Sequence, residues 1–325
     1  MSDYLDINKI MSKEYPVTFV IGARGVGKTI SSISRSIERC MKNNTKFIYL
    51  RRYETEIETL GLNLQLISDL TGYDVTIDVI KDSSGRKARM LKADDTPVGY
   101  LLALSVTGKY KSTDYTNTDL IIYDEFIDQR NRELKGETGL FINFAMTVFR
   151  DFSKYRTLFL ANATNLFNCY FVDFNVYPVG RVTKYHELGI KIVMYDGTKL
   201  NNKRKNTILA KQVKFLEGDS NSSLDNNFRE STDMSFLRKN EKNSVNNLIL
   251  HCSNQDFGLW KNSNYYVISD KYNNTSTKYT LDDLIETYNY DSTLIHELRY
   301  YLYNNKLFFN NKKTRSVFMK LLKYS

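Results

Sequence analysis

The chain has 325 residues, of which 42% are hydrophobic and 26% charged, and this suits one large or two smaller globular domains with apolar cores. Its formal net charge of +9 favours a polyanionic partner, although a basic surface also serves solubility. We expect no membrane span, no signal peptide, no disulfide framework and no zinc site. The sequence has no run of roughly 18 uncharged apolar residues, no basic-then-apolar N-terminus, and no CxxC or metal-ligand spacing among its cysteines and histidines. We therefore expect a protein of the cytoplasm.

From residue 17 to residue 165, short apolar runs alternate with amphipathic stretches, which is typical of βαβ units around a largely parallel sheet. Between residues 72 and 105 two strand-like runs flank a turn-rich segment at 94–97, and this indicates antiparallel hairpins inserted at the edge of the sheet. The predicted parallel strands are 17–21, 46–51, 119–125 and 156–161, and the predicted helices are 28–43 and 138–154.

The first predicted strand runs directly into the sequence GARGVGKT, residues 22–29, which matches the pattern GxxxxGK[ST] at every fixed position. Its glycines allow successive backbone N–H groups to face a nucleotide phosphate. Lys28 is expected to reach the β- and γ-phosphates, and the Thr29 hydroxyl to hold Mg²⁺. The predicted cofactors are therefore ATP and Mg²⁺, and a glycine-rich turn that binds nothing is the alternative. The other predicted nucleotide-binding residues are Gly22, Ala23, Arg24, Gly25, Val26 and Gly27.

The strand predicted at 119–125 ends in two carboxylates, those of Asp124 and Glu125. Asp124 is expected to bind Mg²⁺, and Glu125 to polarise the attacking water, which favours hydrolysis of ATP over GTP signalling or small-molecule phosphoryl transfer. The next strand places Asn162 at the corresponding position, where ring ATPases keep a residue that senses the γ-phosphate. An asparagine that only caps the following turn is the alternative.

Residues 201–230 are rich in Asn, Ser, Lys and Asp, which is typical of a linker or a small polar subdomain. We predict three parts: an ATPase domain at 1–200, a linker subdomain at 201–230 and a C-terminal domain at 231–325. Residues 201–325 hold 19 Lys and Arg against 13 Asp and Glu, so the density of basic charge rises toward the C-terminus. The predicted strands of this part are 245–251, 257–260 and 265–268, and its predicted helices are 281–288 and 316–322.

Several segments together resemble the DNA encapsidation ATPases of phi29-type podophages. They are the loop at 19–29, FIYLRRY at 47–53, DEFI at 124–127, MTVFR at 146–150 and the Ala-Asn-Ala strand end at 161–163. The resemblance covers most of residues 17–165. It implies an α/β fold in which a RecA-like ASCE P-loop ATPase domain is followed by a linker subdomain and a small RNase H-like C-terminal domain, a vestigial nuclease.

The resemblance also implies an assembly and its partners. The family forms a homomeric ring, generally taken as a pentamer, on the portal (connector) protein of a procapsid in the host cytoplasm, and drives double-stranded DNA inward. In phi29 relatives the C-terminal domain docks onto the portal and onto a structural packaging RNA. These properties are expectations for the present chain.

A residue of the neighbouring subunit is implied as well. Arg150 matches the position from which such rings supply an arginine finger, worth about 10³ to 10⁵ in rate where it operates. Arg156 is a local competitor for this role. Lys111 is a second candidate for reaching across the interface, although Lys109 stands beside it and both suit a solvated loop. Arg24 fits the family pattern without an assigned role.

Three other functions stay open. Another ring ATPase, such as a helicase, a translocase or a secretion motor, would share the phosphate chemistry but not the segments at 47–53 and 146–150. A nucleic-acid-binding scaffold with a vestigial P-loop is disfavoured by the intact motif residues. A terminase with an active nuclease domain needs acidic residues that converge on two metals, and those available are Asp256, Asp270, Asp282 and Asp283.

Overall fold

The computed structural model divides the chain into two compact units, which are described separately. The first comprises Met1–Thr164 and Pro178–Phe228, and the second Asn165–Tyr177 and Arg229–Ser325. The structure describes residues 5–325 except 82–86, 111–114, 128–132, 163–167, 179, 196–206, 209–235, 241–242, 253–254, 282–288, 291, 305, 312, 316, 319–321 and 323–325. The predicted linker therefore lies outside the described residues apart from 207 and 208. No helix in the described part is long and apolar enough to cross a membrane.

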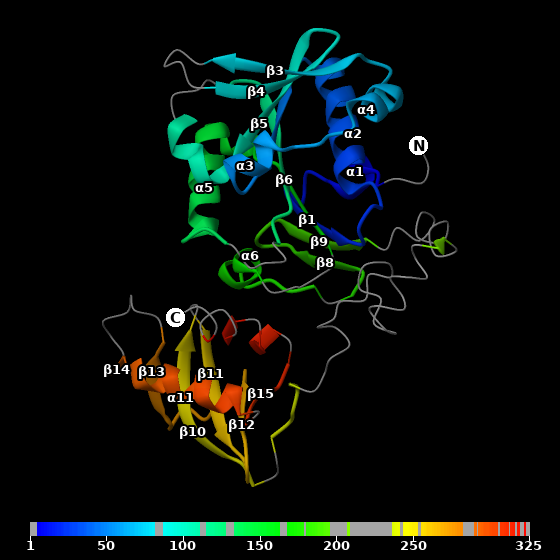
Figure 1. The fold of residues 1–325 in the computed structure, drawn as a ribbon. Coiled ribbons are helices and arrows are strands. Elements are labelled where there is room, and N and C mark those ends of the chain that lie inside the picture. The colour runs from blue at the N-terminus through cyan, green and yellow to red at the C-terminus, as the bar shows by residue number, and fades with distance from the viewer. Residues whose placement is uncertain are drawn as a thin grey trace. The chain divides into compact units, whose positions relative to one another are not determined.

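The first unit is built on a nine-stranded sheet with the order β3-β4-β5-β2-β6-β7-β1-β9-β8 (Figure 1). All neighbours from β5 to β9 in this order pair in parallel, as the alternating pattern predicts, and the outer pairs are antiparallel. The strands are β1 Val17–Gly22, β2 Lys46–Arg51, β3 Val75–Lys81, β4 Lys87–Ala93, β5 Thr96–Ala103, β6 Thr118–Asp124, β7 Thr157–Asn162, β8 Val182–Tyr185 and β9 Ile190–Tyr195.

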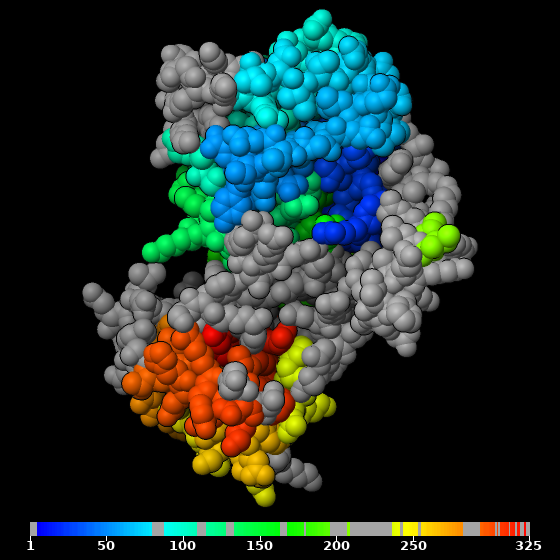
Figure 2. Space-filling view, in the orientation of Figure 1, coloured from blue at the N-terminus to red at the C-terminus, as the bar shows by residue number. Residues whose placement is uncertain are grey.

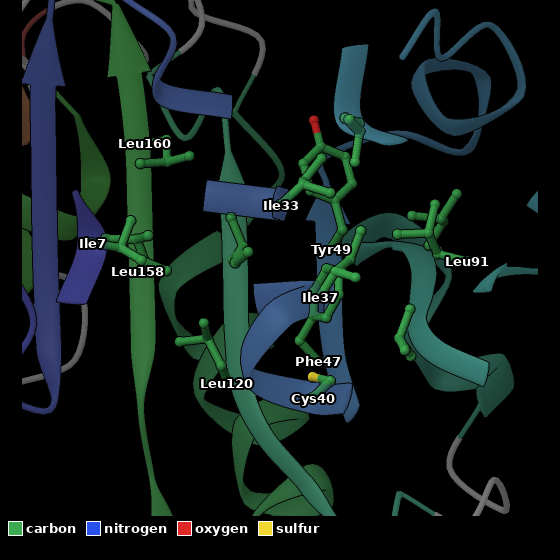
Figure 3. Packing of buried hydrophobic residues seen from close by; sticks show 14 of the residues in the cluster. Ile7, Ile33, Ile37, Cys40, Phe47, Tyr49, Leu91, Leu120, Leu158 and Leu160 are labelled. Atoms are coloured by element: carbon green, nitrogen blue, oxygen red, sulfur yellow. The ribbon is translucent and has the colours of Figure 1, made fainter. Parts of the chain in front are cut away.

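Helices cover both faces of this sheet, with α2 and α5 on opposite sides (Figure 1). Because successive strand residues point to opposite faces, Ile122 and Leu158 join the core under α2, whereas Tyr123 and Phe159 pack with Phe141 of α5. Figure 3 shows Ile33, Ile37 and Cys40 in the first of these cores. The helices of this unit are α1 Ile7–Ile10, α2 Lys28–Asn43, α3 Glu54–Glu58, α4 Leu64–Thr71 and α5 Glu137–Val148, with 3₁₀ segments η1 Leu104–Tyr110 and η2 Phe152–Lys154.

Two local expectations have clear outcomes. The hairpins at the sheet edge are confirmed: β4 turns into β5 at Asp94 and Asp95, whose φ angles of 45° and 61° suit a tight hairpin turn. The predicted helix 138–154 is too long, because α5 ends at Val148 and Asp151 starts a new turn by accepting a hydrogen bond from the Ser153 amide.

The second unit contains a six-stranded sheet with the order β14-β13-β10-β11-β12-β15. β10, β11 and β12 form an antiparallel meander, β13 pairs in parallel with β10, and β15 in parallel with β12. The three predicted strands are present, whereas β13, β14, β15 and helix α11 were not predicted. Its elements are α6 Cys169–Asp173, β10 Val245–Cys252, β11 Gln255–Lys261, β12 Tyr266–Ser269, β13 Thr277–Thr280, β14 Asn289–Tyr290, α11 Ser292–Tyr303 and β15 Leu307–Phe309.

The sheet of the second unit has its own apolar core, which includes Leu250, Phe257, Ile268, Leu298 and Phe309. The strands and α11 form one closely packed body, coloured yellow to red in Figure 2. Of the two helices predicted here, 281–288 lies outside the described residues apart from 281, and the described residues 317, 318 and 322 of the other are helical.

Candidate nucleotide-binding and hydrolysis site

The glycine-rich loop connects the carboxyl end of β1 to the first turn of α2. Gly25 and Gly27 have φ angles of 70° and 78°, in the left-handed region that side chains disfavour. These two residues let the backbone curl around the N-terminus of α2, where N–H groups without helical partners can face an anion. Gly22 is required for a different reason, since a Cβ there would lie 2.4 Å from the carbonyl oxygen of Tyr195 in β9.

Lys28 points its ammonium back across the loop. Its Nζ donates to the carbonyl oxygens of Gly22 (3.0 Å) and Ala23 (2.7 Å) and to Oδ1 of Asn162 (3.2 Å). Burial lowers the pKa of Lys28 to about 8, against the raising effect of Asp124 and Glu125, and the nearby Arg24 lowers it further. The protein thus holds a poorly solvated cation beside a loop of amide donors, as phosphate binding requires.

The buried cation should also reduce stability in the absence of nucleotide. Between pH 8, the approximate pKa of Lys28 in the folded chain, and pH 10.5, its ordinary value, Lys28 is protonated in the unfolded chain but largely neutral in the folded chain. Its contribution to the free energy of unfolding therefore rises with pH across this window. We expect Lys28→Met to be more stable than the wild type at pH 7, with the difference shrinking toward pH 10.5. Urea unfolding at several pH values measures this, and a difference independent of pH would contradict it.

Asp124, the last residue of β6, is 4% exposed, and its Oδ2 accepts hydrogen bonds from two hydroxyl groups. Thr29 Oγ1 donates at 2.7 Å and Tyr49 OH at 2.8 Å. Burial, together with the negative charge of Asp124, raises the pKa of Tyr49 well above its ordinary value, so the phenol stays a neutral donor. A threonine hydroxyl beside a carboxylate is the hard oxygen donor set that Mg²⁺ prefers, and the residues present therefore fit this ion.

Glu125 follows Asp124 in a left-handed backbone conformation, with φ 57°. Its side chain is 48% exposed, and Oε2 lies 2.5 Å from Nη2 of Arg51, at the end of the neighbouring strand β2. Burial lowers the pKa of Arg51, but Tyr49, Asp124 and Glu125 together raise it above its ordinary value, so the guanidinium is fully charged. Arg51 and Tyr49 are two site residues that the sequence pattern did not single out. The signal that could have found them is a phenol and an arginine near the carboxyl end of a buried strand whose other central residues are apolar, KFIYLR at 46–51.

Asn162 completes the same edge because β7 lies between β1 and β6 in the sheet. It pairs in register with Gly22, and its amide oxygen accepts a hydrogen bond from Lys28. The structure thus brings Lys28, Thr29, Asp124, Glu125 and Asn162 together at the carboxyl edge of the sheet.

Arg150 does not lie at this edge. It is exposed, follows the end of α5, and lines a cavity of about 200 Å³ with Thr118, the first residue of β6. Thr118 and Arg150 therefore lie near the amino ends of the parallel strands, and the six residues of β7 span roughly 20 Å from there to the opposite edge. Arg150 cannot reach the P-loop of its own chain.

The other basic candidates are placed as follows. Arg156 immediately precedes β7 at the amino edge; burial lowers the pKa of Arg156, Arg39 lowers it further, and Asp119 opposes both effects. Asp119 is itself paired with Arg39 at 2.7 Å. Arg24 is exposed on the glycine-rich loop. Lys111 lies outside the described residues, as does the side chain of Lys109.

Of the four acidic residues named for a terminase nuclease, Asp256 and Asp270 are described, and they contact different partners. Asp256 is bonded to His251 at 2.6 Å and to Lys278 at 2.7 Å, whereas Asp270 accepts from Asn310 and Asn311. Asp282 and Asp283 lie outside the described residues. Within the described ranges no group of three or more His, Cys, Asp or Glu residues is arranged to hold a metal ion.

Similarity to known proteins extends over almost the whole chain. The chain is 29% identical to the DNA packaging protein of Bacillus phage B103, over 97% of this chain and 98% of that protein. It is 28% identical to the DNA packaging protein of Bacillus phage phi29, over 97% and 96% of the two chains.

Solved structures show the same fold. A chain of the bacteriophage phi29 viral genome packaging motor assembly superimposes with a TM-score of 0.71 at 24% identity, covering 98% of each chain. The N-terminal domain of the DNA packaging ATPase from bacteriophage phi29 gives a TM-score of 0.52 at 29% identity, over 60% of this chain and 97% of that domain. Residues 1–324 match the family described as podovirus DNA encapsidation protein (Gp16), and the chain belongs to that family.

Proposed function

We propose that this protein is the ATPase of a genome-packaging motor, which couples ATP hydrolysis to the movement of double-stranded DNA into a procapsid. The observation that carries the proposal is the convergence of Lys28, Thr29, Asp124, Glu125 and Asn162 at one edge of the sheet, in a chain that belongs to a DNA encapsidation family. These residue types at one strand edge are those that phosphoryl transfer to water needs.

The proposed roles follow from the contacts. Backbone N–H groups of residues 22–27 bind the phosphates, and Lys28 exchanges its carbonyl partners for phosphate oxygens. Thr29 and Asp124 hold Mg²⁺, which neutralises phosphate charge when bound. Glu125 accepts the proton of the attacking water, and Asn162, which already contacts Lys28, responds to the γ-phosphate. Tyr49 keeps Asp124 in place through its hydroxyl.

The finer fold assignment is part of the proposal. The position of β7 between β1 and β6 supports a RecA-like ASCE ATPase domain in the first unit. The meander β10-β11-β12, extended in parallel by β13 and β14, supports an RNase H-like second domain. We retain the domain bounds 1–200, 201–230 and 231–325 as a proposal.

The assembly is proposed on the same footing: a homomeric ring of five subunits on the portal protein, in the host cytoplasm, with a packaging RNA as a further partner. The placement of Arg150 supports a ring, because an exposed arginine remote from its own P-loop is available to a neighbour.

The direct test is ATP turnover with and without duplex DNA. We expect duplex DNA to stimulate ATP turnover. We also expect the binding of duplex DNA to be insensitive to its sequence, because a motor must hold phosphates rather than base edges. If six to ten phosphates are contacted, affinity should fall by about 10³ to 10⁵ between 50 and 200 mM salt. Shuffled duplexes of equal length are the control. A footprint confined to one sequence would contradict translocation, and strand separation would favour the helicase alternative.

A further inference from the structure

A buried ion pair between Arg52 and Glu137 lies next to the backbone of Glu125, a residue of the proposed hydrolysis site. Arg52 Nε and Nη2 donate to the two carboxylate oxygens of Glu137 at 2.7 and 2.9 Å, with side chains 2% and 0% exposed. Each of these oxygens accepts a second hydrogen bond, one from Tyr123 OH and one from the Leu134 amide, both at 2.8 Å. Glu137, at the start of α5, is therefore fully bonded and holds the Arg52 guanidinium in one orientation.

The other edge of the guanidinium faces the backbone that follows β6. Nη2 donates to the carbonyl oxygen of Phe126 at 2.7 Å, and Nη1 to that of Glu125 at 3.3 Å. Arg52 thus connects a fixed carboxylate to the peptide groups on the carboxyl side of Glu125 and Phe126. The position of these peptide groups constrains the Cα atom of Glu125, from which its side chain extends.

Glu125 needs such support because its φ of 57° is uncommon for a residue with a side chain. Backbone of this kind persists only where surrounding contacts hold it, and it concentrates at functional sites. Successive residues of one strand end supply the contacts: Arg51 pairs with the Glu125 carboxylate, and Arg52 with its carbonyl oxygen. A buried ion pair is in general no more stabilising than apolar packing of the same volume, so stability alone does not account for the pair.

We propose that Arg52, oriented by Glu137, is a positioning residue that fixes the backbone of Glu125 and so directs its carboxylate for hydrolysis. This rests on the proposed ATPase function. Lysine at position 52 retains a positive charge, but its single ammonium nitrogen carries three donors and cannot replace the four hydrogen bonds that Arg52 donates from three nitrogens to Glu137, Glu125 and Phe126.

The experiment compares Arg52→Lys with the wild-type full-length chain in steady-state turnover and in ATP binding. We expect kcat to fall about 10- to 100-fold, since small misplacement of a reacting group is costly. The dissociation constant for ATP should stay within about twofold, because the contacts of Lys28 and of the glycine-rich loop are unchanged. Unchanged kcat in folded Arg52→Lys, or a loss confined to ATP affinity, would overturn the proposal.

Two further variants separate positioning from general stability. Phe141→Leu removes an aromatic ring that stacks on Tyr123, 5.9 Å between centroids, and it is expected to lower the melting temperature while leaving kcat near wild type. Glu137→Gln keeps the shape of the bridge and removes its charge. It should lower kcat as Arg52→Lys does, and it decides by the same criteria if the latter variant does not fold.

A double-mutant cycle gives the sharpest result. If Arg52 acts through Glu125, adding Arg52→Lys to Glu125→Gln should leave the residual single-turnover rate unchanged. A loss that multiplies with that of Glu125→Gln would show a purely structural role and reject the proposal. A wild-type chain that binds ATP without hydrolysing it would instead reject the ATPase function on which the proposal rests.

Discussion

Glu125→Gln is expected to bind ATP as the wild type does and to hydrolyse it about 10²- to 10⁴-fold more slowly, the usual loss when a general base is removed. Glutamine preserves the volume of the side chain and the backbone at φ 57°, but its amide cannot accept the proton of the attacking water. Equilibrium binding of a fluorescent ATP analogue, followed by single-turnover hydrolysis, separates the two effects. Wild-type turnover in this variant would remove Glu125 from the mechanism.

Lys28→Ala is the matched comparison, because it should stop turnover at the binding step. Lys28 is 6% exposed, and its ammonium already contacts three oxygen acceptors, two of them carbonyl oxygens of the loop itself. Its loss removes the ammonium that donates to these oxygens and that would bind the phosphates, and ATP affinity should fall. Two variants that fail identically, both in binding or both in chemistry, would contradict the separate roles proposed for Lys28 and Glu125.

Arg150→Ala is expected to lower ATP turnover by about 10³- to 10⁵-fold in an assembly made only of this variant, while ATP binding persists. The reason is geometric. Arg150 lies near the amino edge of the sheet and the P-loop at the carboxyl edge, so its guanidinium can stabilise transition-state charge only in a neighbouring subunit. Lys154→Ala is the control, since Lys154 lines the same cavity, is 73% exposed and pairs weakly with Asp151 at 3.9 Å. It should leave turnover near wild type.

Mixing two inactive variants tests whether Arg150 acts on a neighbour. Glu125→Gln subunits retain Arg150, and Arg150→Ala subunits retain Glu125, so a mixed ring contains some interfaces at which both residues are intact. We expect partial recovery of ATP turnover in the mixture. A mixture as inactive as either parent, in rings whose mass confirms assembly, would count against the role in trans.

Sequence alone identified two kinds of site residue: those in one continuous segment, and those at the carboxyl ends of parallel strands. Residues 22–29 form a continuous segment whose conformation depends on its own glycines, and Gly25 and Gly27 adopt the positive φ angles that such a loop needs. Asp124 and Asn162 were predicted because the carboxyl ends of parallel strands meet at one edge. The pairing of Gly22 with Asn162 in register confirms that placement.

Tertiary structure alone decided which residues surround Asp124 and Glu125. Tyr49, Arg51 and Arg52 became neighbours of the acidic strand because β2 lies beside β6, and strand order depends on long-range packing of helices and strands that no local pattern encodes. Glu137 contacts Arg52 only because α5 packs on the face of the sheet opposite α2. The sequence therefore determined which chemical groups are available at the site, because side-chain periodicity is a local property. The tertiary structure determined which residues support those groups, because hydrogen-bond partners come from distant parts of the chain.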